Sequence, residues 1–303
     1  LDQYRLDGVR LKAAAFTNLS HDHFDYHASE EDYFQAKARL FSELLPEDGI
    51  AVLNADCEHQ GRLVEIAEAR GLKVISYGFR GWDINIKRRR PSRDGQMLEL
   101  EVFGKTCLIE MPVIGDFQAE NALCALGLVL ACGADQDAAV DALNHLHGVT
   151  GRIEKVVEHP NGAPVFVDFA HTPDALEHVL KALKSHARDR LVVVFGCGGD
   201  RDVEKRSVMG VVACQFADHV IVTDDNPRFE DAAAIRHQVM KCCDRAMEVG
   251  DRADAIRAAV AGLNEGDVLV IAGKGHESGQ IIRDEVLPFN DGEQARMAVA
   301  EIG

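Results

Sequence analysis

The chain has 303 residues, enough for two domains with separate hydrophobic cores. Its composition, 47% hydrophobic and 27% charged, indicates a globular rather than a disordered protein. The formal net charge of −17 argues against nucleic-acid or anionic-membrane binding, because both partners require a basic surface. We therefore expect any anionic ligand to be held by a local cluster of basic side chains.

The cysteine spacing and the length of the apolar runs suggest a cellular context. The eight cysteines show no CxxC spacing, which favours a reduced, cytoplasmic protein over a disulfide scaffold or a zinc module. No apolar run reaches the roughly 20 residues that span a bilayer, so we expect no membrane insertion. Leu1 to Arg5 contain no initiator Met, and we expect them to come from the interior of a longer protein.

The first half of the chain predicts alternating strands and helices, the order typical of βαβ units. Apolar alternation and β-branched runs predict strands, whereas helical spacing that stops at Pro46, Gly71 or Gly133 predicts helices. The expected strands are residues 13–16, 50–54 and 73–77, with strand-like pieces over 82–112, and the expected helices are 30–45, 62–69, 117–132 and one ending near 147.

The segment 148–152 is the best candidate for a domain boundary, which divides the chain into domains 1–150 and 151–303. Beyond it the pattern predicts an open, mostly parallel sheet with helices on both faces. The expected strands are 164–169, 191–195, 219–223 and 268–272, and the expected helices are 173–187, 204–216, 231–247 and 252–264.

A polar turn, Thr223–Arg228, follows the apolar run 219–222. In a parallel α/β sheet, ligands bind at the carboxyl ends of the strands. Asp225, Asn226 and Arg228 can together hold an ammonium and a carboxylate, as amino-acid recognition requires. A simple polar turn is the alternative for this loop alone.

Other predicted strands end in loops of the same kind, and this convergence favours a ligand site. The loop with Gly196 and Arg201 and the loop with Gly273 and Glu277 are rich in glycine, but neither matches a dinucleotide or P-loop pattern. Asp168 and His171 also follow a strand, and Arg152 at the boundary can clamp a phosphate.

The first half contains three weaker signals. The segment Thr17–His27 holds three His and two Asp, a partial ligand set for Mg²⁺ or Mn²⁺, with a polar loop as the alternative. Lys37 lies on a predicted helix, where most lysines are solvated. Asn121 lies in an apolar helix start, where a buried amide can read a base edge or make a cap or helix–helix hydrogen bond.

Taken together, these motifs resemble those of the Mur ligase family, in the family's order from the first residue to the last. The matching segments are Asn18–Leu19–Ser20, Asp22–His23, Asp25–Tyr26–His27, Tyr33 with Ala36–Lys37, Gly151–Arg152, Asp168 with Ala170–Pro173, Gly196–Arg201, Asp225–Arg228 and Gly273–Glu277.

The resemblance implies an α/β fold: the remainder of a P-loop-type central ATPase domain, then a C-terminal doubly wound, mostly parallel-sheet domain that binds the amino acid. It implies a ligase of peptidoglycan synthesis in which ATP activates a peptide carboxylate as an acyl phosphate, which an amino-acid amine then attacks. The substrates would be ATP with Mg²⁺, a UDP-N-acetylmuramoyl dipeptide and meso-diaminopimelate, and the enzyme would be a monomer.

The same resemblance assigns roles to individual residues. For ATP and the metal it implies His23 as a Mg²⁺ ligand, Lys37 as a carbamate holding a second Mg²⁺, Asn121 as the adenine contact, Arg152 as the phosphate clamp, Asp168 as the ribose contact and His171 as a neighbouring contact. For the other substrates it implies Arg5 at the UDP-linked peptide and Arg201, Asp225, Asn226, Arg228, Gly273 and Glu277 around diaminopimelate. Arg228 would discriminate, because it can pair bidentately with the far carboxylate that lysine lacks.

The family's P-loop, G-x-x-x-x-G-K-[ST], is absent from these 303 residues. We therefore expect that the chain alone neither hydrolyses ATP nor ligates an amino acid. The alternatives are a lysine-adding ligase, a folylpolyglutamate synthetase and a non-catalytic amino-acid-binding fragment. Arg228 argues against the first two, and the missing P-loop favours the third. A dinucleotide oxidoreductase would rest only on the glycines from 196 to 199.

Overall fold

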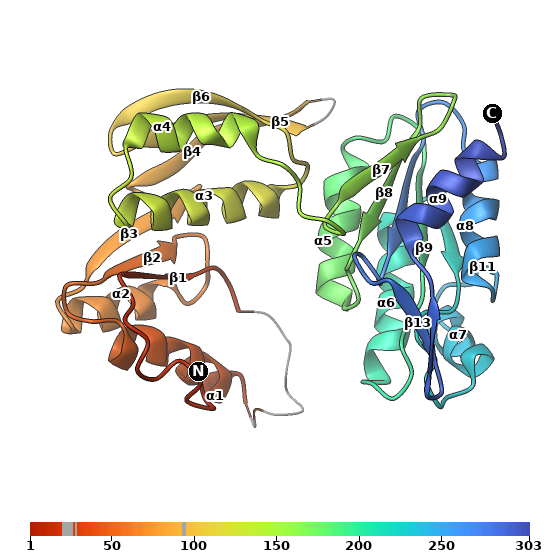
Figure 1. Ribbon diagram of the computed structural model, residues 1–303, viewed down its shortest axis with the longest axis horizontal. Coiled ribbons are helices and arrows are strands. Elements are labelled where there is room, and N and C mark those ends of the chain that lie inside the picture. Colours follow the sequence, from red (N-terminus) through yellow and green to blue (C-terminus); the bar gives the residue numbers. More distant parts are fainter. Residues whose placement is uncertain (20–26, 28, 93–94) are drawn as a thin grey trace. The chain divides into compact units, whose positions relative to one another are not determined.

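The computed structural model describes residues 1–19, 27, 29–92 and 95–303. It divides the chain into two compact units, Leu1–His147 and Gly148–Gly303. The division falls after residue 147, where the sequence predicts it after residue 150. Each unit is built on its own six-stranded sheet (Figure 1).

The sheet of the first unit has three parallel and two antiparallel strand pairings. Strands β1 to β4 are parallel neighbours, and β4, β5 and β6 continue as an antiparallel meander. The strands are β1 (Ala13–Phe16), β2 (Ile50–Asn54), β3 (Lys73–Gly78), β4 (Ile84–Ser92), β5 (Gly95–Val102) and β6 (Lys105–Met111).

Helices cover this sheet through two separate apolar clusters. Phe34 and Leu63, from α1 (Glu30–Arg39) and α2 (Gln60–Ala69), pack in one cluster. Leu123 of α3 (Asp116–Ala131) packs in the other. A π-helical turn over Leu40–Leu44 extends α1 towards Pro46, and α4 (Gln136–Asp141) continues as a 3₁₀ turn over Ala142–His145.

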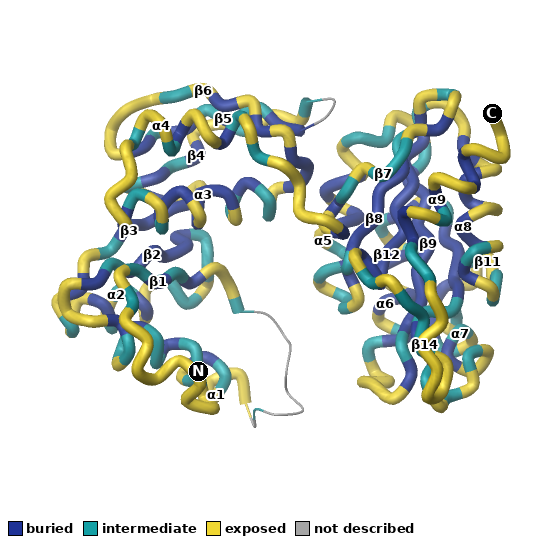
Figure 2. The backbone as a smooth tube through the Cα atoms, viewed as in Figure 1, coloured by how far each residue is buried: buried dark blue, intermediate teal, exposed yellow. Residues whose placement is uncertain are grey.

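The second unit has the doubly wound sheet that the sequence predicts, in the order β11-β10-β9-β12-β8-β7. All neighbours are parallel except the antiparallel edge strand β7. The strands are β7 (Glu154–Glu158), β8 (Pro164–Asp168), β9 (Leu191–Phe195), β10 (His219–Val222), β11 (Met247–Glu248) and β12 (Val268–Ala272). Every residue of the central strands β9 and β12 is buried, as expected for a parallel sheet covered on both faces (Figure 2).

The covering helices begin at sequence signals that explain their start points. The Thr172 side chain caps α5 (Pro173–Lys184), and Pro173 occupies the first helical turn. Asp231, Asp251 and Asn290 cap α7 (Ala232–Met240), α8 (Arg252–Ala261) and α9 (Asp291–Ala300) in the same way. No helix in the described part of the chain is long and apolar enough to cross a membrane. The α/β class with mostly parallel strands is thus confirmed.

The structure corrects the predicted helix over 231–247. Helix α7 ends at Met240, and the chain then turns until β11 begins at Met247. The sequence pattern also gave no prediction of β7, of α9 or of the hairpin formed by β13 (Gly279–Ile282) and β14 (Glu285–Pro288). Strands β7, β13 and β14 have four or five residues, none of them buried. Helix α9 is longer and half buried, but its buried residues are Asp291, Gly292, Ala295, Ala298 and Val299, which give only a weak apolar pattern.

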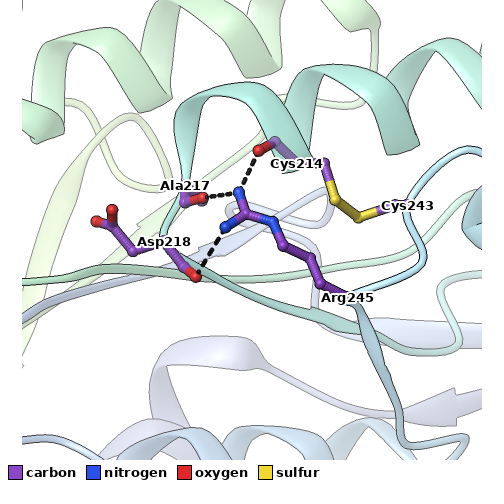
Figure 3. Close-up of a disulfide and its surroundings, with 5 residues drawn as sticks. All are labelled: Cys214, Ala217, Asp218, Cys243 and Arg245. Atoms are coloured by element: carbon purple, nitrogen blue, oxygen red, sulfur yellow. Dashed lines mark hydrogen bonds between the residues drawn. A yellow bond between two sulfur atoms is a disulfide. The ribbon is translucent and has the colours of Figure 1, made fainter.

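The segment after α7 contains a disulfide, so the expectation that all cysteines are reduced is wrong at one pair. Cys243 is bonded to Cys214 near the end of α6 (Glu204–Phe216), and their Cα atoms lie 5.7 Å apart (Figure 3). Arg245 donates hydrogen bonds to the carbonyls of Cys214, Ala217 and Asp218, which satisfies acceptors left open where α6 ends (Figure 3). The two cysteines lie 29 residues apart in sequence, and only the fold brings them together.

Candidate functional site

The carboxyl ends of β9, β10 and β12 carry the three polar loops that the sequence singles out. Because these strands are parallel neighbours, the loops after Phe195, Val222 and Ala272 leave the sheet at the same edge. Side chains of these loops contact one another.

Asn226 is buried and links two of these loops. Its Oδ1 accepts hydrogen bonds from Lys274 Nζ at 2.7 Å and from the Ile281 N–H at 2.9 Å. Its Nδ2 donates to Glu277 Oε2 at 3.1 Å. The amide is therefore fixed in one orientation, and it holds the Glu277 carboxylate at the edge of the sheet.

Lys274 is the cation at the centre of this network. Its side chain is fully buried, and its ammonium also lies 3.3 Å from Glu277 Oε2 and 2.9 Å from the Gly279 carbonyl oxygen. Three acceptors thus match the three donors of a buried ammonium, which would otherwise be costly to bury. Sequence reasoning did not assign this lysine to the site. Its position between two glycines at a strand end was the available signal.

Arg228 reaches from the β10 loop to the β9 loop. Its Nη1 donates to the Gly199 carbonyl oxygen at 2.7 Å, and its backbone is bonded to Ile281 and Arg283 of the hairpin segment. Arg228 has φ +51°, a left-handed conformation that non-glycine residues rarely adopt. A Cβ atom at Gly198 would lie 2.9 Å from this guanidinium, so the glycine leaves the space that Arg228 occupies.

The remaining predicted residues of the pocket lie around this network. Asp225 is half-buried, and a Cβ at Gly273 would approach its Oδ2 to 2.8 Å, with Gly273 itself at φ +117°. Arg201 is exposed, and its guanidinium donates to the Asp200 carbonyl oxygen at 3.3 Å. The structure therefore brings Asp225, Asn226, Arg228, Gly273 and Glu277 to one edge of the sheet, with Arg201 on the adjoining loop.

Asp168, the expected ribose contact, is bound by two backbone N–H groups. It is buried, its Oδ2 accepts from the Ile153 N–H at 2.8 Å, and its Oδ1 accepts from the Ala170 N–H at 2.7 Å. Burial raises the pKa of this carboxyl, and the two backbone hydrogen bonds oppose the shift. In this structure Asp168 therefore holds the turn that follows Arg152 against the end of β8.

Beside Asp168, basic side chains surround the ring of Phe169. The Arg152 guanidinium is exposed and lies 4.7 Å from the ring centre. The imidazoles of His171 and His276 lie 4.7 and 5.4 Å from it, and Lys205 Nζ donates to the His171 carbonyl oxygen at 2.9 Å. The cluster thus includes two cationic side chains, Arg152 and Lys205.

The predicted residues of the first unit do not form a described site. His23 lies outside the described residues, and Arg5 is exposed in the N-terminal segment. Lys37 is half-buried on α1, with its ammonium 4.8 Å from the Tyr33 ring centre. Asn121 is exposed on α3, so the expectation that its amide is buried is wrong: the α3 residues 122–124 that follow it face the core instead.

The described residues do not by themselves fit a magnesium ion. No group of three His, Cys, Asp or Glu side chains in the described part of the chain could hold a metal. An ammonium does not ligate a cation, so Lys37 could do so only as the carbamate that the family resemblance implies.

Comparison with known proteins matches both units. The model of the Mur ligase middle domain matches residues 1–129, and that of the Mur ligase glutamate ligase domain matches residues 151–275. The UDP-N-acetylmuramoyl-L-alanyl-D-glutamate–2,6-diaminopimelate ligase of Bradyrhizobium diazoefficiens is 51% identical over 304 residues, which cover 99% of this chain and 62% of the relative.

Solved structures give the same result. A diaminopimelate ligase of the same name is 37% identical, with a TM-score of 0.68 over 99% of this chain and 62% of its own. The folylpolyglutamate synthase of Mycobacterium tuberculosis, complexed with ADP and AMPPCP, is 26% identical, with a TM-score of 0.68 over 86% of this chain and 61% of its own. The chain thus spans 62% of the length of the diaminopimelate ligases it matches. Both units and their order identify the chain as a member of the Mur ligase family.

Proposed function

We propose that the chain is the part of an ATP-dependent ligase that binds meso-diaminopimelate for addition to UDP-N-acetylmuramoyl-L-alanyl-D-glutamate in peptidoglycan synthesis. The observation that carries this proposal is the Asn226–Lys274–Glu277 network beside the Arg228 guanidinium. The relatives named as diaminopimelate ligases, similar over nearly the whole chain, support the same reading. We place the reaction in the cytoplasm, and we propose that the protein is a monomer.

The chemistry of the substrate fits this arrangement of charges. Diaminopimelate carries an ammonium and a carboxylate at each end. The Glu277 carboxylate can bind an ammonium, and the Arg228 guanidinium can pair with the far carboxylate through two parallel hydrogen bonds. Lysine has no far carboxylate, and its terminal ammonium would face a cation. Arg228 therefore attracts diaminopimelate and repels lysine.

In the reaction of the family, ATP would activate the dipeptide carboxylate as an acyl phosphate, and the bound amine would displace phosphate. This chain would hold the attacking amino acid in a fixed orientation, which lowers the entropic cost of the second step. Arg152 beside Phe169 is our proposed phosphate contact, and Asn121 our proposed adenine contact. Both side chains are exposed, so a ligand can reach them. Bound Mg²⁺ would neutralise phosphate charge.

The test is to replace Arg228 with Ala and to measure ligand affinity by calorimetry. We expect diaminopimelate affinity to fall about 100-fold, since a charge-assisted bidentate pair contributes roughly 3 kcal/mol. Affinity for lysine should stay the same or rise. Arg257→Ala is the control: it removes another partly exposed guanidinium, on α8, which pairs with Asp254 and Glu301. Unchanged diaminopimelate affinity in Arg228→Ala would contradict the pocket assignment.

A further inference from the structure

We propose that the ion pair between Arg206 and Glu230 is a positioning pair that sets the place of the Arg228 guanidinium. The inference rests on the proposed function, because it explains how the proposed amino-acid site holds its discriminating residue. Neither partner is among the residues that the sequence motifs assign to a ligand.

The pair is bidentate, with a buried guanidinium and a carboxylate that is 31% exposed. Arg206 Nη1 lies 2.8 Å from Glu230 Oε2, and Nη2 lies 2.7 Å from Oε1. The Arg206 side chain is 1% exposed, and its Nη1 also donates to Gln238 Oε1 of α7 at 2.8 Å. Arg206 belongs to α6 and Glu230 to the loop after β10, so the pair joins two separate segments of the unit.

A single peptide group connects this pair to Arg228. The N–H of Asp200 donates to Glu230 Oε1 at 2.5 Å. The carbonyl of the same peptide group, that of Gly199, accepts from Arg228 Nη1 at 2.7 Å. Because a peptide group is planar and rigid, Glu230 on one side fixes the direction of the carbonyl that receives Arg228 on the other. Arg206 supports the same loop through a 3.2 Å hydrogen bond to the Gly198 carbonyl oxygen.

The two loops need such support because each contains a strained residue. Asp200 has φ +52° and Arg228 has φ +51°, and left-handed conformations at non-glycine residues persist only where the surroundings hold them. The Phe229 N–H donates to Asp200 Oδ2 at 3.2 Å, which closes the contact between the loops. Without the Glu230 carboxylate, the Asp200 N–H would lose its acceptor, and the Arg206 charge would be left buried and unpaired.

The same unit contains a matched pair at the opposite edge of its sheet. Arg190 Nε lies 3.2 Å from Asp267 Oδ1, its Nη2 lies 2.5 Å from Oδ2, and Asp267 is 1% exposed. These residues immediately precede β9 and β12, whereas the proposed site follows the carboxyl ends of the same strands. Removing Asp267 should therefore reduce stability without moving Arg228.

The experiment compares Glu230→Gln and Asp267→Asn with the unaltered 303-residue chain by amide hydrogen exchange. We expect the Asp200 and Phe229 amides to exchange about tenfold faster in Glu230→Gln, while amides of β9 keep their protection. Asp267→Asn should lower the melting temperature without changing exchange at Asp200 or Phe229. If Glu230→Gln does not fold, Glu230→Asp retains the carboxylate on a side chain that is one methylene shorter. We then expect a smaller acceleration of exchange at Asp200 and Phe229.

Exchange decides the inference. Rates at Asp200 and Phe229 within about twofold of the unaltered chain, or an equal acceleration in Asp267→Asn, would overturn it. Calorimetry separately decides the function on which the inference rests. We expect Glu230→Gln to reduce the preference for diaminopimelate over lysine by about tenfold, and Asp267→Asn to leave it unchanged. If the unaltered chain does not prefer diaminopimelate, the proposed function fails, while the exchange result still decides the positioning of the loops.

Discussion

The ammonium of Lys274 is fully shielded from solvent, and it is bound by three oxygens from Asn226, Glu277 and Gly279. Such a group is expensive to desolvate, so it is retained only where its partners compensate for the lost water. Here the partners include two residues of the proposed amino-acid site. The lysine therefore stabilises the shape of the site.

Replacing Lys274 with Met should destabilise the second unit by about 3 kcal/mol, because it leaves buried acceptors without a donor. Trp82, the only tryptophan, belongs to the first unit. Its fluorescence therefore reports the unfolding of that unit, while circular dichroism reports the unfolding of both units. We expect the circular-dichroism transition in urea to shift and the fluorescence transition to stay. Lys181→Met, which breaks the exposed pair with Glu177, should change stability by about 0.5 kcal/mol or less. Equal effects of the two replacements would contradict the account.

Glu230 provides a prediction about pH. Its hydrogen bonds with Arg206 hold the pKa of this carboxyl below its ordinary value of 4.5. A lowered pKa in the folded state means that the pair stabilises the protein above pH 4.5, and that this contribution is lost as the pH falls through the folded-state pKa. In urea titrations between pH 3 and 7, the free energy of unfolding should therefore fall less on acidification for Glu230→Gln than for the unaltered chain. The difference should correspond to the uptake of about one proton on unfolding. Parallel pH profiles would show that Glu230 is not paired as described.

At the scale of elements, α6 connects the site to the rest of the second unit. Its first turn carries Arg206 near the proposed site, its middle contacts α7, and its end carries the disulfide to Cys243. Gly210 lies at the contact with α7, where a Cβ would approach the Val239 carbonyl oxygen to 2.0 Å. Only glycine allows the two helices to lie this close.

Gly210→Ala should therefore force α6 and α7 apart and destabilise the second unit by about 3 kcal/mol. Gly61→Ala is the matched control, because a Cβ at this exposed position of α2 meets no atom within 4 Å. We expect it to change stability by about 0.5 kcal/mol or less. Urea unfolding followed by circular dichroism measures both. A well-tolerated Gly210→Ala would mean that the helices are less closely packed than described.

The elements that the sequence predicts well are those with strong local patterns. The runs 191–195 and 268–272 are continuous and apolar, and the helix over 204–216 appears with the predicted bounds. Helix α7 ends before its predicted limit, in the segment whose Cys243 is joined to Cys214 and whose Arg245 binds the end of α6. Contacts between distant segments override local propensity there, and a local pattern cannot reveal them.

At the scale of the whole molecule, the ligand contacts that the family resemblance implies are divided between the two units. The first unit carries Lys37 and Asn121, and the second carries Arg152, Asp168 and the proposed amino-acid site. The motifs predicted Asn226, Arg228 and Glu277 at one sheet edge because each follows a parallel strand. They did not assign Lys274, Arg206 or Glu230 to this arrangement, because the hydrogen bonds that define their roles become visible only in the folded unit.

The central claim is that the second unit selects diaminopimelate. The most direct test is calorimetric titration of the 303-residue chain with meso-diaminopimelate and, separately, with lysine. We predict binding of diaminopimelate at least about tenfold tighter than binding of lysine, and loss of this preference in Arg228→Ala. Equal affinity for the two amino acids, or tighter binding of lysine, would contradict the account.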